Sequence, residues 1–218
     1  IGGGPAGLAA AIHYADLIRQ HNETIDSGNL NAAKLPLNVM LLEKANAMGN
    51  HSLSGAVINP AAFRELLPDV VDKDFPVETP VLKDDIQFFT AKKAFALPFH
   101  PPYMGNNGNY LAALGKVVRW LAQIAEKKGI QVFTGFSGHE FIFENGKVAG
   151  VRTGASGIDK HGQPMANYQP PTEVRAKVTI LAEGTRGHLT KTLIEKFNLS
   201  QDRNPQVYSL GIKEIWEV

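Results

Sequence analysis

The opening stretch, residues 1–7, is the part of this 218-residue chain that most constrains its fold. Gly2, Gly4 and Gly7 match the G-x-G-x-x-G pattern, and an apolar stripe predicts a helix from about Ala6 to Gln20. In such a loop the first glycine allows a sharp turn out of a strand, and the second lets a pyrophosphate approach the backbone. The third glycine allows the helix to pack closely on the strand, and the helix N-terminus faces the phosphates with free N–H groups. We therefore predict a dinucleotide site that also includes Pro5 and Ala6.

An acidic residue ends the next predicted strand. Residues 39–42 form a short apolar run, and Glu43 follows them directly. In dinucleotide folds a carboxylate at this position accepts hydrogen bonds from the adenosine ribose. The acidic residue usually follows the glycine loop by about 20 residues. Here the polar stretch 21–38 makes the interval longer without changing this geometry. The alternative is an ordinary charged residue at a strand end. We expect Glu43 to bind the ribose, with Lys44 beside it.

Two later segments supply further candidate residues for the cofactor. The loop 44–55 is rich in small residues, and we assign His51, Ser54 and Gly55 to the flavin side of the cofactor. His51 could instead bond backbone carbonyls. A second apolar strand, 178–182, ends in Glu183 and Gly184, where a cofactor can pass close to the backbone. Glu183 has two open readings: a polar neighbour of the cofactor, or a cap for a helix expected at 187–197.

The order of the remaining predicted elements indicates an α/β sheet interrupted by an insertion. These elements are strand-like pieces at 86–90 and 94–97, a helix at 109–128, a strand at 130–133, a hairpin at 141–151 turning at Asn145-Gly146, a polar loop at 158–171, a strand at 174–181 that returns to the central sheet, and strands from 207 onward. We predict a Rossmann-like FAD-binding domain of the glutathione-reductase type with an inserted α+β substrate domain. Its two parts would be residues 1–60 and 108–200, separated by an insertion at 61–107 and followed by the start of a further domain at 201–218.

Composition excludes several classes of function. The 22 basic and 21 acidic residues give a net charge of +1, and no basic cluster indicates nucleic-acid binding. The chain has no cysteine, so it can form neither a disulfide nor a thiolate metal site. No apolar run approaches the roughly 20 residues that span a bilayer. We find no paired carboxylates or catalytic triad, and we predict no general acid or base.

A proline-rich apolar stretch, 94–104, is the other informative segment. Its large apolar side chains follow Lys92 and Lys93 and are Phe95, Leu97, Phe99, Tyr103 and Met104. One reading is core packing beneath a substrate domain, which is the commoner case. The other is an exposed apolar surface that dips into lipid headgroups, with Lys93 at the anionic surface.

Several stretches together resemble the electron transfer flavoprotein–ubiquinone oxidoreductase family. They are Gly2-Gly-Gly-Pro-Ala-Gly-Leu8, Leu42-Glu-Lys44, His51-Ser-Leu-Ser-Gly-Ala56, Asn106-Asn-Gly-Asn-Tyr110, Lys177-Val-Thr-Ile-Leu-Ala-Glu-Gly184 and Gly211-Ile-Lys-Glu-Ile-Trp216. The resemblance implies FAD, one [4Fe–4S] cluster, and electron transfer from reduced electron transfer flavoprotein to ubiquinone. It also implies a monotopic protein of the mitochondrial inner or bacterial cytoplasmic membrane with a hydrophobic hairpin near residues 94–104, which favours the membrane reading. Residues 61–107 would then face the quinone and the membrane, and 201–218 would begin the quinone domain.

The cluster of this family cannot be held by the present residues. Its ligation needs four thiolates, and the chain has no cysteine. Only Ile1 remains of the strand expected before the glycine loop. We therefore expect an N-terminal portion of the enzyme that is inactive alone. One alternative is a related soluble FAD-dependent reductase or monooxygenase. It would need a second glycine fingerprint to bind NAD(P)H, and we find none in the sequence. The other alternative is an FAD-binding module without turnover.

Overall fold

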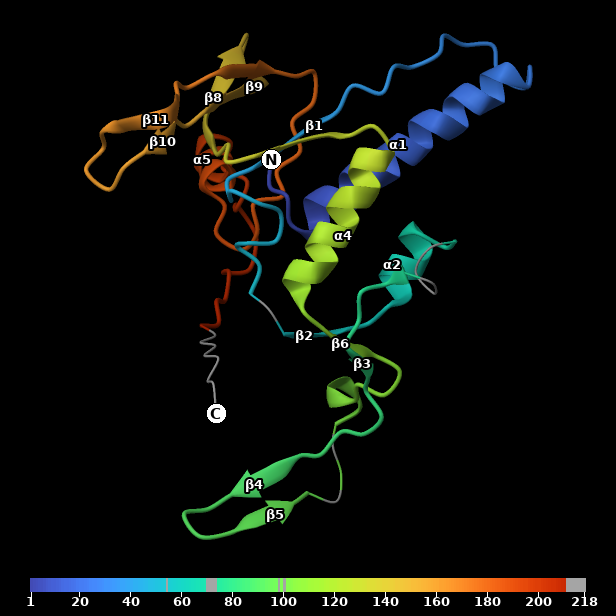
Figure 1. Ribbon diagram of the computed structural model, residues 1–218, viewed down its shortest axis with the longest axis vertical. Helices are drawn as coiled ribbons and strands as arrows, with labels where there is room; N and C mark the ends of the chain where they lie inside the picture. Colours follow the sequence, from blue (N-terminus) through green and yellow to red (C-terminus); the bar gives the residue numbers. More distant parts are fainter. Residues whose placement is uncertain (54, 70–73, 98, 100, 211–218) are drawn as a thin grey trace.

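A short parallel sheet lies at the centre of the molecule, between two helices and an antiparallel sheet (Figure 1). The computed structural model describes residues 1–53, 55–69, 74–97, 99 and 101–210. The helices are α1 (Pro5–Asp26), α2 (Ala61–Leu66), η1 (Pro102–Met104), α4 (Leu114–Lys127) and α5 (His188–Lys196). The strands are β1 (Met40–Glu43), β2 (Ala56–Ile58), β3 (Thr79–Pro80), β4 (Gln87–Phe89), β5 (Ala94–Ala96), β6 (Tyr110–Ala112), β7 (Gln131–Thr134), β8 (Gly138–Glu144), β9 (Lys147–Thr153), β10 (Ser156–Ile158), β11 (Pro164–Gln169) and β12 (Glu173–Arg175).

The central strands β1 and β7 run parallel, as predicted for residues 39–43 and 130–133. Ile1 extends this sheet on the other side of β1, where the N–H of Gly2 donates to the carbonyl of Leu42 at 2.8 Å. The N–H of Ala182 donates in turn to the carbonyl of Ile1 at 2.8 Å. Residues 180–182 therefore lie beside Ile1 in the sheet, although their partner is too short for a regular strand.

The predicted return of residues 174–181 to the central sheet is correct only at its end. Residues 173–175 form β12, which pairs antiparallel with β9 in a separate sheet of order β12-β9-β8. The chain reaches the parallel sheet only at residue 180.

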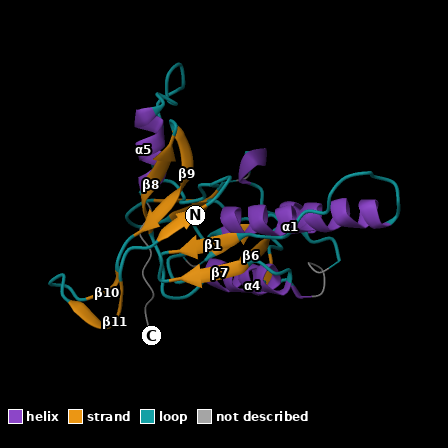
Figure 2. Cartoon of the chain, turned by 90° about the horizontal axis from the view of Figure 1, so that it is seen from above, coloured by secondary structure: helices purple, strands orange, loops and turns teal. Residues whose placement is uncertain are grey.

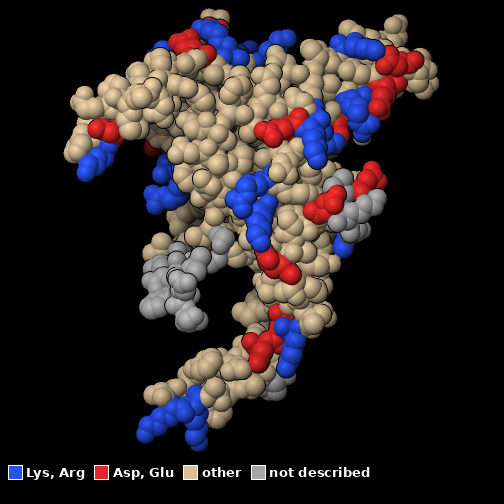
Figure 3. Space-filling view, in the orientation of Figure 1, with Lys and Arg blue, Asp and Glu red and all other residues tan. Residues whose placement is uncertain are grey.

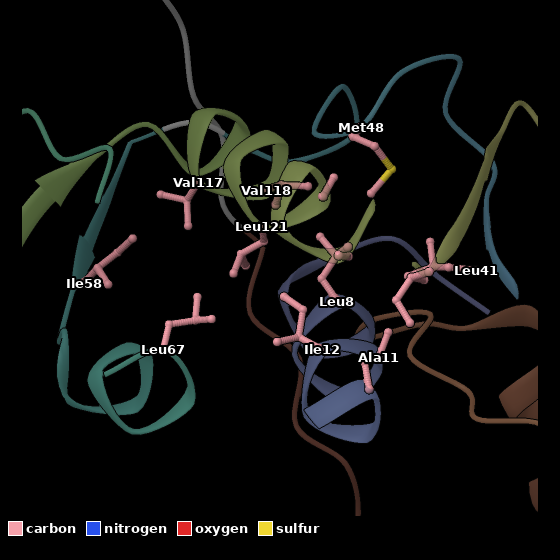
Figure 4. Packing of buried hydrophobic residues seen from close by; sticks show 14 of the residues in the cluster. Leu8, Ala11, Ile12, Leu41, Met48, Ile58, Leu67, Val117, Val118 and Leu121 are labelled. Atoms are coloured by element: carbon pink, nitrogen blue, oxygen red, sulfur yellow. The ribbon is translucent and has the colours of Figure 1, made fainter. Parts of the chain in front are cut away.

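Alternate residues of β1 face two different cores, because successive side chains of a strand point to opposite faces. Leu41 packs in the larger core, with side chains from α1 and α4 (Figure 4). Both helices lie along the same two parallel strands (Figure 2). Leu42 faces the other way and packs with Val151 of β9 and Leu189 of α5. The parallel sheet is thus covered on both faces, as is usual for such sheets.

Helix α1 is longer than predicted and ends at Asp26 rather than near Gln20. No helix breaker occurs before Ser27 and Gly28, and Gly28 adopts a φ of +76° that ends the helix. The first six residues of the supposed polar loop are therefore helical. The returning segment is tied to the helix by Asn22, whose amide exchanges two hydrogen bonds of 2.9 Å with the backbone of Leu35.

The helix predicted from residue 109 begins instead at Leu114. Residues 110–112 form β6, which pairs with β2 and β3. The apolar side chain of Leu111 suited the helical stripe, but the backbone of this segment bonds to strands distant in sequence. The sheet β2-β6-β3 contains one strand from each of the three proposed parts, 1–60, 108–200 and 61–107. The domain boundaries at 60 and 107 remain predictions.

The hairpin predicted at 141–151 is confirmed, and the strand-like pieces predicted at 86–90 and 94–97 pair with each other as a second hairpin. β4 pairs with β5, and β8 pairs with β9. The turn residues Asn145 and Gly146 have φ values of 50° and 76°, as a type I′ turn requires. β10 and β11 form a further hairpin over residues 156–169, so the prediction of a polar loop at 158–171 is wrong. Its strands are almost entirely exposed, and the polar composition concealed them. Residues 207–210 form no strand, and 211–218 lie outside the described residues.

None of the helices in the described part of the chain is both long enough and apolar enough to cross a bilayer.

The larger core should contribute most of the stability of the α1–α4 pair. Ile12 is completely buried between the helices, whereas Leu17 of the same helix is 47% exposed. We expect Ile12→Ala to lower the free energy of unfolding by about 2–5 kcal/mol, because it leaves a cavity. Leu17→Ala should change it by less than about 0.5 kcal/mol. Chemical denaturation of the intact protein measures both, and equal effects would contradict this packing.

Candidate functional site

A cleft of about 660 Å³ opens at the carboxyl ends of the central strands. Parallel α/β sheets bind their ligands at this edge. The cleft is lined by Ile1, Gly2, Gly3, Gly4, Pro5, Ala6, Leu42, Glu43, Lys44, Gly49, His51, Ser52, Ser137, Gly138, His139, Ala182, Glu183, Gly184, Arg186, Gly187 and His188.

The three motif glycines have different surroundings. Gly2 has a φ of +102°, and a Cβ there would lie 2.3 Å from the carbonyl oxygen of Ala182. A Cβ on Gly7 would lie 2.0 Å from the carbonyl oxygen of Gly2. Packing therefore requires glycine at both positions. A Cβ on Gly4 would meet nothing within 4 Å and would project into open space. Glycine at position 4 leaves that space free for a ligand.

Helix α1 begins at the wall of the cleft, with Gly4 at its N-cap and Pro5 as its first residue. The first N–H groups of a helix have no partner within the helix, and the helix dipole adds partial positive charge there. No side chain caps this end. The loop and the helix together therefore form a cradle for an anionic group such as a phosphate.

The carboxylate of Glu43 connects β1 to the glycine loop. It accepts a hydrogen bond of 2.7 Å from the N–H of Gly3 and one of 2.8 Å from the N–H of Ala45. His51 is nearby, with its Nδ1 3.9 Å from the carboxylate. A carboxylate has about four acceptor positions, so two backbone bonds leave capacity for a hydroxyl group in the cleft. Glu43 is thus more than an ordinary charge at a strand end.

Glu183 makes the capping contacts that one of its two predicted readings requires. Its carboxylate accepts hydrogen bonds from the backbone N–H groups of Leu189 and Thr190, at 3.2 and 2.8 Å, and from the Thr190 hydroxyl at 2.8 Å. An acidic group at a helix N-terminus is favourable. Glu183 therefore holds the start of α5 at the edge of the cleft. Its contact with a cofactor remains a prediction.

Most of the predicted cofactor residues line one cleft. Two do not: Gly7 lies behind the loop, and Gly55 is absent from the lining. Ser54 lies outside the described residues. The assignment of the predicted set to a cofactor remains a prediction.

Sequence reasoning missed the cleft residues at and just before the starts of β8 and α5. His139 and His188 stack at the cleft, with ring centroids 6.1 Å apart, and Arg186 lines the same cleft. The segment after β7 reaches the cleft because Phe136 donates its N–H to the carbonyl of Glu43 at 2.9 Å. Residues that follow a parallel strand lie at the ligand-binding edge, so the polar stretch after 130–133 was an available signal. No described group of His, Asp or Glu side chains could hold a metal ion.

The predicted apolar residues are not part of this cleft. They lie on and beside the β4–β5 hairpin, which projects from the opposite end of the molecule (Figure 1). Phe95, Phe99 and Tyr103 are 52%, 71% and 82% exposed. Within the described chain, these side chains do not form a core. Phe88 and Phe89 of the same hairpin are also exposed and were missing from the prediction.

The different roles of Gly4 and Gly7 can be separated by stability. We expect Gly7→Ala to lower the free energy of unfolding by about 1–3 kcal/mol, because the backbone clash outweighs the gain of about 1 kcal/mol in helix propensity. Gly4→Ala should change it by less than about 1 kcal/mol. Denaturation of the ligand-free protein measures both variants. A Gly4→Ala protein as unstable as Gly7→Ala would contradict the open space at Gly4.

Structural comparison identifies the fold. The chain superimposes on THI4 of Thermovibrio ammonificans with a TM-score of 0.52 and 20% identity, covering 90% of this chain and 60% of that one. It matches the myxobacterial chondrochloren halogenase CndH, described as an FAD-dependent halogenase, with a TM-score of 0.51 and 20% identity over 88% of this chain and 38% of that one. The Rossmann-like fold typical of FAD-dependent flavoproteins is therefore confirmed.

Sequence comparison extends over the whole chain. No model of a protein family matches it. The chain is 43% identical over 223 residues to a probable electron transfer flavoprotein–ubiquinone oxidoreductase of Acinetobacter baylyi, covering 100% of this chain and 37% of that protein. It is 40% identical over 220 residues to the mitochondrial human protein of that name, covering 34% of it. The Pseudomonas aeruginosa protein of that name is 43% identical over 223 residues, with 38% covered. The chain thus belongs to the electron transfer flavoprotein–ubiquinone oxidoreductase family and spans little more than a third of the length of these relatives.

Proposed function

We propose that this chain binds FAD in its cleft and forms the flavin-binding part of an electron transfer flavoprotein–ubiquinone oxidoreductase. The observation that carries the proposal is the 40–43% identity along the whole chain to proteins of that name. The enzyme would take electrons from reduced electron transfer flavoprotein and pass them to ubiquinone. Because the chain spans about a third of these relatives, the complete reaction is proposed for the intact protein.

The residues present fit FAD. Gly4 leaves open space beside the free N–H groups of α1, where a pyrophosphate would sit. Glu43 would accept a hydrogen bond from the ribose while it holds the glycine loop through Gly3. Lys44, His51 and Gly184 would form further walls of the same site. Ser54 and Gly55 remain proposed on the flavin side by sequence alone.

The chain contributes binding and orientation to the proposed reaction. When bound, FAD supplies the redox chemistry by accepting and releasing electrons. We assign no general acid or base to the cleft. We also propose that the family's [4Fe–4S] cluster is held outside these 218 residues, because its thiolate ligands require cysteine and the chain has none.

The projecting hairpin is proposed to contact a membrane. Phe88 and Phe95 are directly opposed across β4 and β5, and both are more than half exposed. A contiguous exposed apolar surface marks an interaction site, and ubiquinone partitions into lipid. Peripheral attachment here would give access to the quinone at a mitochondrial inner or bacterial cytoplasmic membrane.

Loss of the space at Gly4 tests the proposed activity. The intact wild-type protein should oxidise reduced electron transfer flavoprotein with a ubiquinone analogue as acceptor. We expect Gly4→Ala to weaken FAD binding about tenfold or more, because its methyl group occupies the space needed by the pyrophosphate, and to lose activity in proportion. Absorbance measures the bound flavin. Direct oxidation of NADPH would instead indicate a reductase or monooxygenase, and bound flavin without turnover would indicate a binding module.

Replacement of the opposed phenylalanines tests the membrane contact. We expect Phe88→Ser with Phe95→Ser to weaken binding of the intact protein to phospholipid vesicles by about tenfold or more for each ring. Each substitution removes an apolar ring that would be buried in the bilayer. Bound FAD should not change. Met165→Ser with Tyr168→Ser on the exposed β10–β11 hairpin is the control and should bind as wild type. Equal vesicle binding by all three proteins, measured by co-sedimentation, would refute the assignment.

A further inference from the structure

The projecting arm, residues 82–105, has an unequal distribution of charge. Lys83, Asp84 and Asp85 lie at its neck, and Lys92 with Lys93 form the turn between β4 and β5. No ionisable residue occurs at 86–91 or 94–99. Figure 3 shows basic side chains at the free end of the arm, beyond a surface without charge. The arm is therefore an apolar band with a basic tip.

The turn that carries the two lysines is fixed by Thr90. The backbone N–H of Thr90 donates to the carbonyl of Lys93 at 2.8 Å, and the N–H of Lys93 donates to the Thr90 hydroxyl at 3.0 Å. Neither lysine side chain contributes to these bonds, and neither forms an ion pair with another described residue. The turn thus places both lysines at the tip, and neither ammonium group has an ion-pair partner in the described part of the chain.

The apolar band is concentrated on one face of the hairpin. Phe88 and Phe95 are paired across the strands, and the N–H of Leu97 bonds the carbonyl of Ile86 at 2.9 Å. Because side chains alternate along a strand, these four residues share a face. The opposite face carries one large apolar side chain, Phe89, besides the smaller Gln87, Ala94 and Ala96. The first face is the one suited to lipid.

This arrangement limits how the arm can meet a bilayer. If the tip entered first, both ammonium groups would reach hydrocarbon, which is strongly unfavourable. If the arm lies flat on its four-residue apolar face, the rings enter the acyl boundary and the lysines extend to the headgroups. The flat orientation satisfies both the apolar face and the charges.

We propose that Lys92 and Lys93 bind the phosphate groups of anionic phospholipids, so that the arm prefers anionic to neutral bilayers. The inference rests on the membrane contact of the proposed function and adds the class of lipid. Charge complementarity supports it, since the tip is basic and its lysines have no described acidic partner. Juxtamembrane basic residues each strengthen binding to an anionic surface, and salt weakens the effect.

The test compares vesicles of phosphatidylcholine alone with vesicles that also contain phosphatidylglycerol. The intact protein should bind the anionic vesicles more tightly, and added salt should reduce the difference. We expect Lys92→Gln with Lys93→Gln to lower affinity for anionic vesicles roughly 30-fold and to leave affinity for neutral vesicles unchanged. Lys92→Arg with Lys93→Arg should retain the preference. Lys147→Gln with Lys160→Gln removes the same charge from the first residue of β9 and from the β10–β11 turn, and should behave as wild type.

The outcomes separate this inference from the membrane contact itself. If the wild-type protein binds both vesicles equally, or if the glutamine variant keeps the preference, the lysine assignment is overturned while the apolar contact stands. If the control variant loses the preference equally, the effect is one of net charge, and the assignment is also overturned. If no vesicle is bound, both the membrane contact and the lysine assignment fail. Flavin absorbance and the quinone assay report the cleft independently.

Discussion

The cleft depends on the hydrogen bonds that align Ile1 and residues 180–182 with β1. These bonds bring three chain segments to one edge, although about 140 residues separate β1 from Ala182. Gly2 can lie between β1 and Ala182 only because it lacks a Cβ, since any side chain there would clash with the carbonyl of Ala182. The glycine loop is thus a packing requirement of the sheet as well as the proposed binding site for a phosphate.

Two carboxylates stabilise the walls of the cleft in the same way. Glu43 accepts backbone N–H groups from the glycine loop, and Glu183 accepts those at the start of α5. Each carboxylate satisfies donors that would otherwise be unpaired near the ligand. The residues proposed to bind the cofactor therefore also determine the shape of the cleft, and this explains why sequence reasoning could not separate a structural from a functional role for Glu183.

The arm is a separate surface with its own attachment. At its neck the backbone N–H and side-chain amide of Asn106 donate to the carboxylate of Asp84, at 2.8 and 3.0 Å. These bonds join the two chain segments that enter and leave the arm. The stretch from Asn106 to Tyr110, which contributed to the resemblance, thus closes the neck and then enters β6.

Sequence alone determined the local elements whose physics is short-range. The glycine spacing, the strand ending at Glu43 and the Asn145-Gly146 turn each depend on neighbouring residues, and each is present as predicted. Tertiary structure decided what depends on distant partners. Residues 110–112 are a strand because they pair with β2, and His139 and His188 come together from distant segments. The phenylalanines of the arm are exposed because no other described segment packs over them. Pairing and burial are set by segments far apart in the chain, so periodicity within one segment does not contain them.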